Sequence, residues 1–184
     1  MDAAREEKAR LRALARSIAP ATATESEQVV ESVREAILRQ DWRVALTFLA
    51  MPGEVDLGSL AQAGLTLAVT RTPPRGPLTI HLLTDELEDH PFGYKQPTAS
   101  APEIASSGID VVLVPGILFG EDGGRLGHGR GYYDTLLSSL HPRPFLIGVT
   151  LARRIVDHVP MTDSDVWMDA VATELGFSEA RAKT

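Results

Sequence analysis

Glycines and charged residues gather in one segment, between positions 114 and 134. Seven of the 15 glycines of the chain lie in it, together with Arg125, Arg130 and Asp134. Glycine lets a backbone approach another group closely, and arginine binds phosphate oxygens through its rigid fork of N–H donors. We therefore predict a site for a phosphate-bearing ligand, with an exposed loop that binds nothing as the alternative.

Two familiar phosphate-binding motifs do not fit this glycine segment. The run 127–132 lacks the last glycine of G-x-G-x-x-G, because Tyr132 stands there. The run 124–131 has the spacing of a P-loop, but arginine and glycine replace the lysine and the serine or threonine. No G-x-S-x-G turn is present either. The segment is thus neither a plain dinucleotide fingerprint nor a P-loop.

The hydrophobic pattern predicts a strand before the glycine segment and a helix after it. Residues 109–114 are nearly all apolar, as in a strand covered on both faces, and a helix is predicted from about Gly131 to Leu140. Ligands of parallel sheets bind beyond the carboxyl ends of the strands, and the first N–H groups of a helix attract anions. The segment is therefore expected where a phosphate would bind.

Strands and helices alternate along the rest of the chain. Helices are predicted at 4–18, at 25–39 with Thr24 and Glu27 as a capping box, and at 56–63. Strands are predicted at 44–49, 65–70, 78–83, 145–150 and 170–173, and a long loop at 84–102. The alternation predicts an α/β fold, with one three-layer domain over residues 1–184 and a mostly parallel sheet flanked by helices.

The composition excludes several classes of function. The net charge of −7 disfavours binding to nucleic acid or anionic membranes. The absence of cysteine removes disulfides, thiolate nucleophiles and cysteine-based zinc sites. Residues 1–16 are rich in charge rather than apolar, unlike a signal peptide. We expect a cytoplasmic protein, a monomer, with a small-molecule substrate and with neither nucleic acid nor a membrane as partner.

The glycine segment resembles that of the 5-formyltetrahydrofolate cyclo-ligase (5,10-methenyltetrahydrofolate synthetase) family. The matching residues are Leu113-Val114-Pro115-Gly116 and Arg125-Leu126-Gly127-x-Gly129-x-Gly131-Tyr132-Tyr133-Asp134, supported by Lys8-x-x-Leu11-Arg12, Gly53-Glu54-Val55-Asp56, Ile147-Gly148-Val149 and Met168-Asp169-Ala170-Val171-Ala172-Thr173-Glu174. The resemblance implies a ligase with a single α/β domain. It would close 5-formyltetrahydrofolate to 5,10-methenyltetrahydrofolate with ATP and Mg²⁺, by phosphorylation of the formyl oxygen and attack of N10, and release ADP and phosphate.

The resemblance also implies roles for particular residues. ATP contacts are implied for Lys8, Arg12, Arg125, Leu126, Gly127, His128, Gly129, Arg130, Gly131, Tyr132 and Tyr133. Substrate contacts are implied for Leu49, Glu54, Gly129, Tyr132 and Tyr133. Arg130 and Asp134 are implied as catalytic residues, and Asp134 and Asp169 as ligands of Mg²⁺.

Each of these roles has a plainer alternative. Lys8 and Arg12 are four residues apart, so they share a helix face that could simply be solvated. Asp134 could be an acid favoured by the helix dipole, and Asp169 a surface acid at a strand edge. Of the two adjacent tyrosines, one is expected in the core, because neighbours at a helix start cannot both face the site.

Residues 71–97 match the family least well. The run Phe92-Gly93-Tyr94-Lys95-Gln96-Pro97 resembles a substrate loop of the family, but Gln96 stands where many relatives have glutamate. The runs 71–75 and 78–83 also depart from the family pattern. These departures keep a second hypothesis open: a non-catalytic or repurposed regulatory module of the same fold that binds a nucleotide or a folate.

Overall fold

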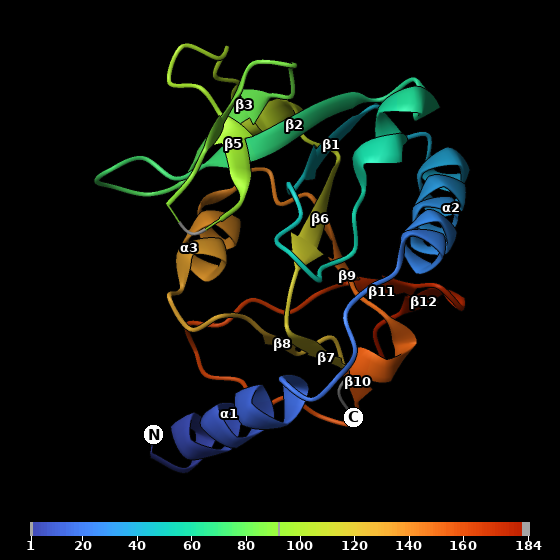
Figure 1. Ribbon diagram of the computed structural model, residues 1–184, viewed down its shortest axis with the longest axis vertical. Coiled ribbons are helices and arrows are strands. Elements are labelled where there is room, and N and C mark those ends of the chain that lie inside the picture. Colours follow the sequence, from blue (N-terminus) through green and yellow to red (C-terminus); the bar gives the residue numbers. More distant parts are fainter. Residues whose placement is uncertain (1, 92, 182–184) are drawn as a thin grey trace.

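A seven-stranded sheet occupies the centre of the computed structural model, which describes residues 2–91 and 93–181 (Figure 1). The strand order is β12 (Gly176–Glu179), β11 (Ala170–Thr173), β9 (Phe145–Val149), β6 (Val111–Pro115), β1 (Val44–Thr47), β2 (Thr66–Arg71) and β3 (Thr79–Leu82). The five inner strands run parallel, and the edge strands β12 and β3 are antiparallel to their neighbours. All strands of this sheet except the edge strand β12 were predicted from the sequence. Phe92, the first residue of the run that resembles a substrate loop, lies outside the described residues.

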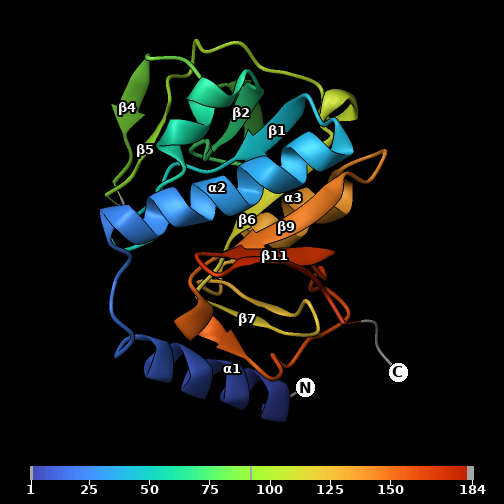
Figure 2. The ribbon, with the colours of Figure 1, turned by 90° about the vertical axis from the view of Figure 1, so that its right-hand side faces the viewer.

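Helices cover both faces of this sheet. Side chains alternate between the faces of a strand, so Val111 and Leu113 of β6 join the core under α2 (Ala23–Gln40). Val112 and Val114 join the core under α3 (Tyr132–Ser139). Figure 2 shows α2 crossing one face of the sheet with α3 behind it. The predicted three-layer α/β fold is thereby confirmed; in the part of the chain that the structure describes, no helix is long and apolar enough to cross a membrane.

The glycine segment was predicted to be a single loop, and this prediction was wrong, because the segment contains a hairpin. Strands β7 (Leu118–Gly120) and β8 (Arg125–Leu126) pair antiparallel, and β10 (Ile155–Val156) adds to them as a three-stranded sheet. Such short strands carry no periodicity that a sequence pattern could show. The hairpin matters because Leu118 and Leu126 pack against Leu11 and Ala15 of α1 (Asp2–Ala15). It supplies part of the apolar surface on which the first helix packs.

The predicted loop 84–102 also contains a hairpin, formed by β4 (Leu87–Asp89) and β5 (Lys95–Pro97). Gln96, only 4% exposed, joins this hairpin to the end of β2. Its Oε1 accepts from the Thr72 N–H at 3.0 Å, and its Nε2 donates to Glu88 Oε1 at 2.9 Å. An amide offers both the acceptor and the donor that this position needs, which explains the glutamine at this point of the chain.

Helix α2 begins two residues before the predicted start. Its capping box is Thr22 with Glu25, not Thr24 with Glu27. Both pairs satisfy the spacing of the motif, and the structure distinguishes them through Arg153, which pairs with Glu25. The described residues also contain three short 3-10 helices: η1 (Gly58–Ala63) in place of the predicted helix at 56–63, η2 (Ser106–Gly108) and η3 (Ala152–Arg154).

Candidate active site

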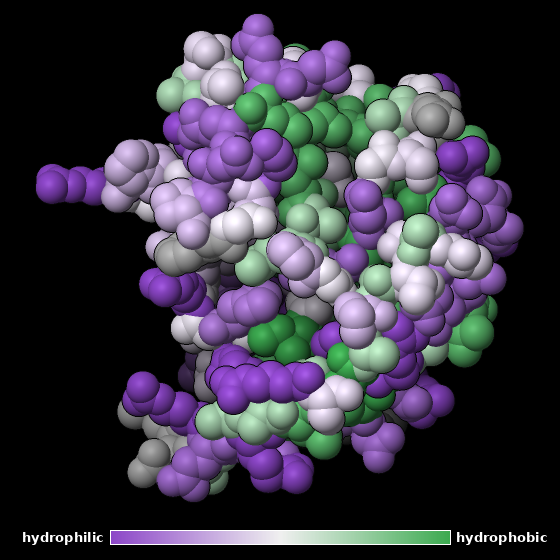
Figure 3. All heavy atoms as spheres, viewed as in Figure 1, coloured by the Kyte–Doolittle hydropathy of each residue, from purple (hydrophilic) through white to green (hydrophobic). Residues whose placement is uncertain are grey.

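A cleft of about 2090 Å³ opens at the carboxyl ends of β1, β2 and β6. Its walls are formed by α1, the segments that follow β1 and β2, the glycine segment with the start of α3, and residues 161–166. Figure 3 shows the molecule hollowed on the side where α1 and α3 face each other in Figure 1. This is the edge at which parallel sheets bind ligands.

The cleft gathers all but one of the residues that the sequence singled out. Its lining includes Lys8, Arg12, Leu49, Glu54, Arg125, Leu126, Gly127, His128, Gly129, Arg130, Gly131, Tyr132, Tyr133 and Asp134. Arg130 is exposed on the rim, whereas Leu126 is fully buried in the core beneath α1. Tyr132 is 40% exposed, while Tyr133 packs against the core under α3.

Asp169 is the residue that the structure does not bring to the cleft. It precedes β11, and its carboxylate accepts from Arg143 at 2.8 and 3.0 Å and from the Leu146 N–H at 2.7 Å. Leu146 lies near the start of β9, so these contacts tie the amino ends of two parallel strands. Asp169 therefore stands at the sheet edge opposite the cleft, apart from Asp134.

A different carboxylate, Asp165, lines the cleft and was missed by the sequence analysis. Its Oδ2 accepts from Lys8 Nζ at 2.5 Å and from the N–H and hydroxyl of Thr162 at 2.6 and 2.7 Å. Burial raises the pKa of Asp165, but Lys8 and Thr162 outweigh it and hold that pKa below its usual range. The N–H of the next residue, Val166, faces Asp134 Oδ1 at 3.4 Å. Asp165 and Asp134 are thus neighbouring acids in the cleft.

Helix α1 reaches the glycine segment through Arg12. Arg12 Nε donates to the Gly127 carbonyl at 2.9 Å. A Cβ at Gly129 would stand 3.3 Å from Arg12 Nη2, and the φ of Gly129 is +92°, which favours glycine. The close approach that the glycines predicted is therefore made, in part, to the arginine of the protein itself.

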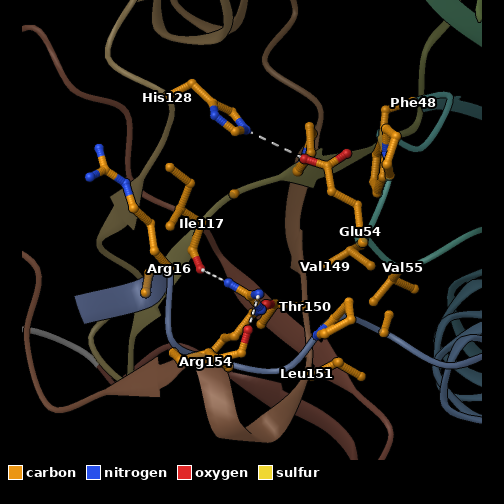
Figure 4. Close-up of a pocket in the computed structure, with 18 of the residues that line it drawn as sticks. Arg16, Phe48, Glu54, Val55, Ile117, His128, Val149, Thr150, Leu151 and Arg154 are labelled. Carbon is orange, nitrogen blue, oxygen red and sulfur yellow. Dashed lines mark hydrogen bonds and ion pairs between the residues drawn. The ribbon is translucent and has the colours of Figure 1, made fainter. Parts of the chain in front are cut away.

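A smaller pocket of about 510 Å³ adjoins the cleft (Figure 4). The two cavities share Arg12, Glu54 and His128, and the His128 Nε2 lies 3.6 Å from Glu54 Oε1. Arg154 reaches the pocket from η3 and donates to the Ile117 carbonyl at 3.2 Å. Burial lowers the pKa of Arg154, while the nearby charges of Arg153 and Glu54 lower and raise it respectively. An arginine remains charged under such a shift.

Part of the wall of the small pocket is apolar and includes Phe48, Val55, Val149 and Leu151. The polar side chains at its borders are those of Glu54, His128, Thr150, Arg12, Arg16 and Arg154. A cavity with apolar walls and a few polar groups suits a flat ring with hydrogen-bonding edges.

The acids of the cleft define what metal it can hold. Among the described residues, no group of three or more His, Cys, Asp and Glu side chains forms a metal cage. Mg²⁺ needs no such cage, because it takes one or two carboxylates and completes its shell with phosphate oxygens and water. Asp134 and Asp165 fit that requirement, whereas Asp134 with Asp169 does not.

The fold and the cleft together are typical of a class of α/β enzymes that bind phosphate groups at the carboxyl edge of a parallel sheet. The family model described as "5-formyltetrahydrofolate cyclo-ligase family" matches residues 2–174. The chain belongs to this family, which confirms the resemblance carried by the glycine segment.

Named relatives and solved structures agree with this assignment. A protein of Caenorhabditis elegans named "Probable 5-formyltetrahydrofolate cyclo-ligase" is 26% identical over 95% of this chain and 96% of its own length. The 5-formyltetrahydrofolate cyclo-ligase of Saccharomyces cerevisiae is 29% identical over 81% of this chain and 84% of its own. The NMR structure of Aquifex aeolicus 5,10-methenyltetrahydrofolate synthetase shares the fold, with a TM-score of 0.78 at 21% identity over 98% of this chain and 94% of that one.

Proposed function

We propose that this protein closes 5-formyltetrahydrofolate to 5,10-methenyltetrahydrofolate with consumption of ATP. The observation that supports it most is the meeting, in one cleft, of the glycine segment, the cations of α1, Asp134, Asp165 and Glu54. The identity of the substrate is supported by the family and by the names of its members.

The reaction needs an activated oxygen. The formyl oxygen attacks the γ-phosphorus of ATP, and ADP leaves. N10 of the folate then attacks the formyl carbon and loses its proton, and the former formyl oxygen departs as part of the phosphate. An amide-type oxygen is a poor leaving group and a phosphate a good one, so the protein mainly aligns reactants and balances charge.

The cations of the cleft bind the phosphate chain in this proposal. Lys8 and Arg12 project from one face of α1 into the cleft, and Arg130 stands on its rim. Lys8 is held by Asp165 in the described structure, so it meets the nucleotide already oriented. Their positive charge offsets the charge that spreads over the transferring phosphoryl group.

Asp134 and Asp165 would hold Mg²⁺ against the nucleotide. The ion, when bound, neutralises the β- and γ-phosphate oxygens. This assignment keeps Asp134 from the sequence analysis and replaces Asp169 by Asp165, because Asp165 lines the cleft beside Asp134 and Asp169 does not.

Glu54, Leu49 and Tyr132 form the folate side. The carboxylate of Glu54 can accept from the neighbouring N–H groups of a 2-amino-4-oxo pyrimidine ring. Leu49 offers an apolar contact, and the exposed ring of Tyr132 can stack on a flat ligand. Tyr133 is the tyrosine whose ring packs with the core, and burial raises the pKa of its hydroxyl.

The test is a direct assay. The purified protein is mixed with 5-formyltetrahydrofolate, ATP and Mg²⁺, and the near-ultraviolet absorbance of the product is followed beside a control without ATP. An ATP-dependent rise is expected. Folate binding without any rise, and without ADP release, would overturn the proposed reaction and favour the regulatory module instead.

A further inference from the structure

Arg125 lies in an enclosed place at the back of the cleft. Its side chain is only 5% exposed, against 20% for its partner Asp134. Nη2 donates to Asp134 Oδ2 at 2.9 Å, and Nη1 donates to the Pro115 carbonyl at 3.2 Å. The ring of Tyr133 lies beneath the guanidinium, with its centroid 5.7 Å from Cζ. Little of this guanidinium is left to meet a ligand.

The side chain of Arg125 occupies space that is free because positions 116 and 127 are glycine. A Cβ at Gly127 would stand 2.8 Å from Nη1 of Arg125 and 3.4 Å from its Cζ. A Cβ at Gly116 would stand 3.3 Å from Cγ of Arg125 and 2.7 Å from the ring of Phe119. Neither glycine is in the left-handed region of φ. Their lack of a side chain therefore serves space, not backbone conformation.

The surroundings of Arg125 are not arranged for stability. Within the described part of the chain its Nε is buried without a hydrogen-bond partner. A buried donor without a partner costs free energy, and a buried ion pair contributes little net stability even when complete. A guanidinium kept there at such a cost points to a role in placing its partner.

We propose that Arg125 is a positioning residue, which acts on the nucleotide through Asp134 and does not itself bind phosphate. This inference rests on the proposed function. Asp134 stands in the first turn of α3, where a carboxylate without partners could adopt more than one rotamer. Arg125 holds one carboxylate oxygen and the Val166 N–H faces the other. These two contacts hold the carboxylate of Asp134 in one orientation toward the cleft. A glycine is needed at position 127 because a side chain there would displace the guanidinium of Arg125.

The first experiment replaces Arg125 by a residue of equal charge. Arg125→Lys keeps the cation, but an ammonium on a flexible stem cannot bridge Asp134 and Pro115 as a planar fork does. Binding of ADP is measured by calorimetry with and without Mg²⁺. Loss of a group that orients a metal ligand weakens metal binding by about 10–100-fold. We expect a loss of this size for Mg²⁺–ADP and less than about two-fold for metal-free ADP. An equal loss for both would overturn the proposal, because it would mean direct phosphate contact.

The second experiment keeps Arg125 and fills the space that its guanidinium occupies. Gly127→Ala should displace the guanidinium and reproduce the selective loss of Mg²⁺–ADP affinity. Gly108→Ala is the matched control, since a Cβ there meets nothing within 4 Å, and should bind as the unchanged protein does. The double variant Arg125→Lys/Gly127→Ala should be no weaker than the stronger single variant, because both changes break one contact.

The outcomes separate the two proposals. Additive losses in the double variant would refute the positioning role. Unchanged Mg²⁺–ADP affinity in Gly127→Ala would refute it even if Arg125→Lys failed to fold. An unchanged protein that binds no Mg²⁺–ADP would instead refute the proposed function. Circular dichroism of each variant shows that the comparison is made between folded proteins.

Discussion

Asp134 and Asp169 show how surroundings distinguish two acids of similar sequence context. Each stands at the start of a regular element, but the contacts of Asp134 face the cleft, and those of Asp169 tie β9 to β11. A local pattern reports the residue type and its place in an element. It does not report at which edge of the sheet the side chain ends.

The two acids are expected to respond differently to the same substitution. Asp134→Asn keeps the shape but removes the charge, and turnover should fall on the order of a hundred-fold or more. The melting temperature should fall as well, because the buried guanidinium of Arg125 loses its counter-charge. Asp169→Asn weakens a half-exposed ion pair and should cost less than about 1 kcal/mol of stability without lowering kcat. Steady-state kinetics and thermal melting of both variants check this; equal losses of kcat would contradict it.

At the scale of elements, the start of α2 is stabilised by Glu25, whose pKa is lowered. Arg153, with further donors from Thr22, lowers the pKa of Glu25 to about 2 from its ordinary 4.5. A lowered pKa of an acid means that its stabilisation is present above the ordinary value and is lost as the pH falls through the lowered one. The capping box therefore adds acid sensitivity to the fold.

Glu25→Gln is expected to reveal this contribution through pH. The melting temperature of the variant should lie below that of the unchanged protein at pH 7. The difference should shrink as the pH falls from about 4.5 and should vanish near pH 2, where Glu25 of the folded protein is itself protonated. Thermal melts between pH 2 and 7 measure it, and a difference that stayed constant across this range would contradict the assignment.

The elements also show what a sequence can and cannot predict. The strand at 109–114 and the helix after Gly131 were predicted because their apolar patterns are local. Lys8 and Arg12 were placed together because helical spacing is local too. Asp165 was missed because its partner Lys8 is 157 residues away, and the two-residue strand β8 because it has no period. The sites of Asp169 and Arg125 depend on contacts between segments, which no local pattern contains.

At the scale of the whole molecule, α1 is the wall of the cleft that buries few apolar side chains, Leu11 and Ala15. It is held by Leu11 and Ala15 against the β7–β8 hairpin, by Lys8 on Asp165 and by Arg12 on Gly127. Elements with few buried apolar contacts open locally before the rest of a fold. A nucleotide between α1 and the glycine segment would join the two sides of the cleft.

Hydrogen exchange should show this joining. Without ligand, the amides of α1 should exchange faster than those of β6 and β9. With Mg²⁺–ADP at about 100 times its Kd, the protein should gain about 2.7 kcal/mol of stability by linkage, and exchange in α1 should slow most. Mass spectrometry after deuterium labelling measures both. Bound nucleotide with unaltered exchange in α1 would show that this helix does not contact it.

The docking of α1 on a distant hairpin has a consequence for how the protein is made. Leu11 packs with Leu118, which is synthesised more than a hundred residues later. A ribosome that adds about 5–20 residues per second needs roughly 5–20 s to reach it. During that time the apolar side chains of residues 2–15 have no partner on the hairpin, so they are open to chaperones. The cleft itself is complete only once residues 161–166 have emerged, so the proposed nucleotide site is among the last parts of the molecule to form.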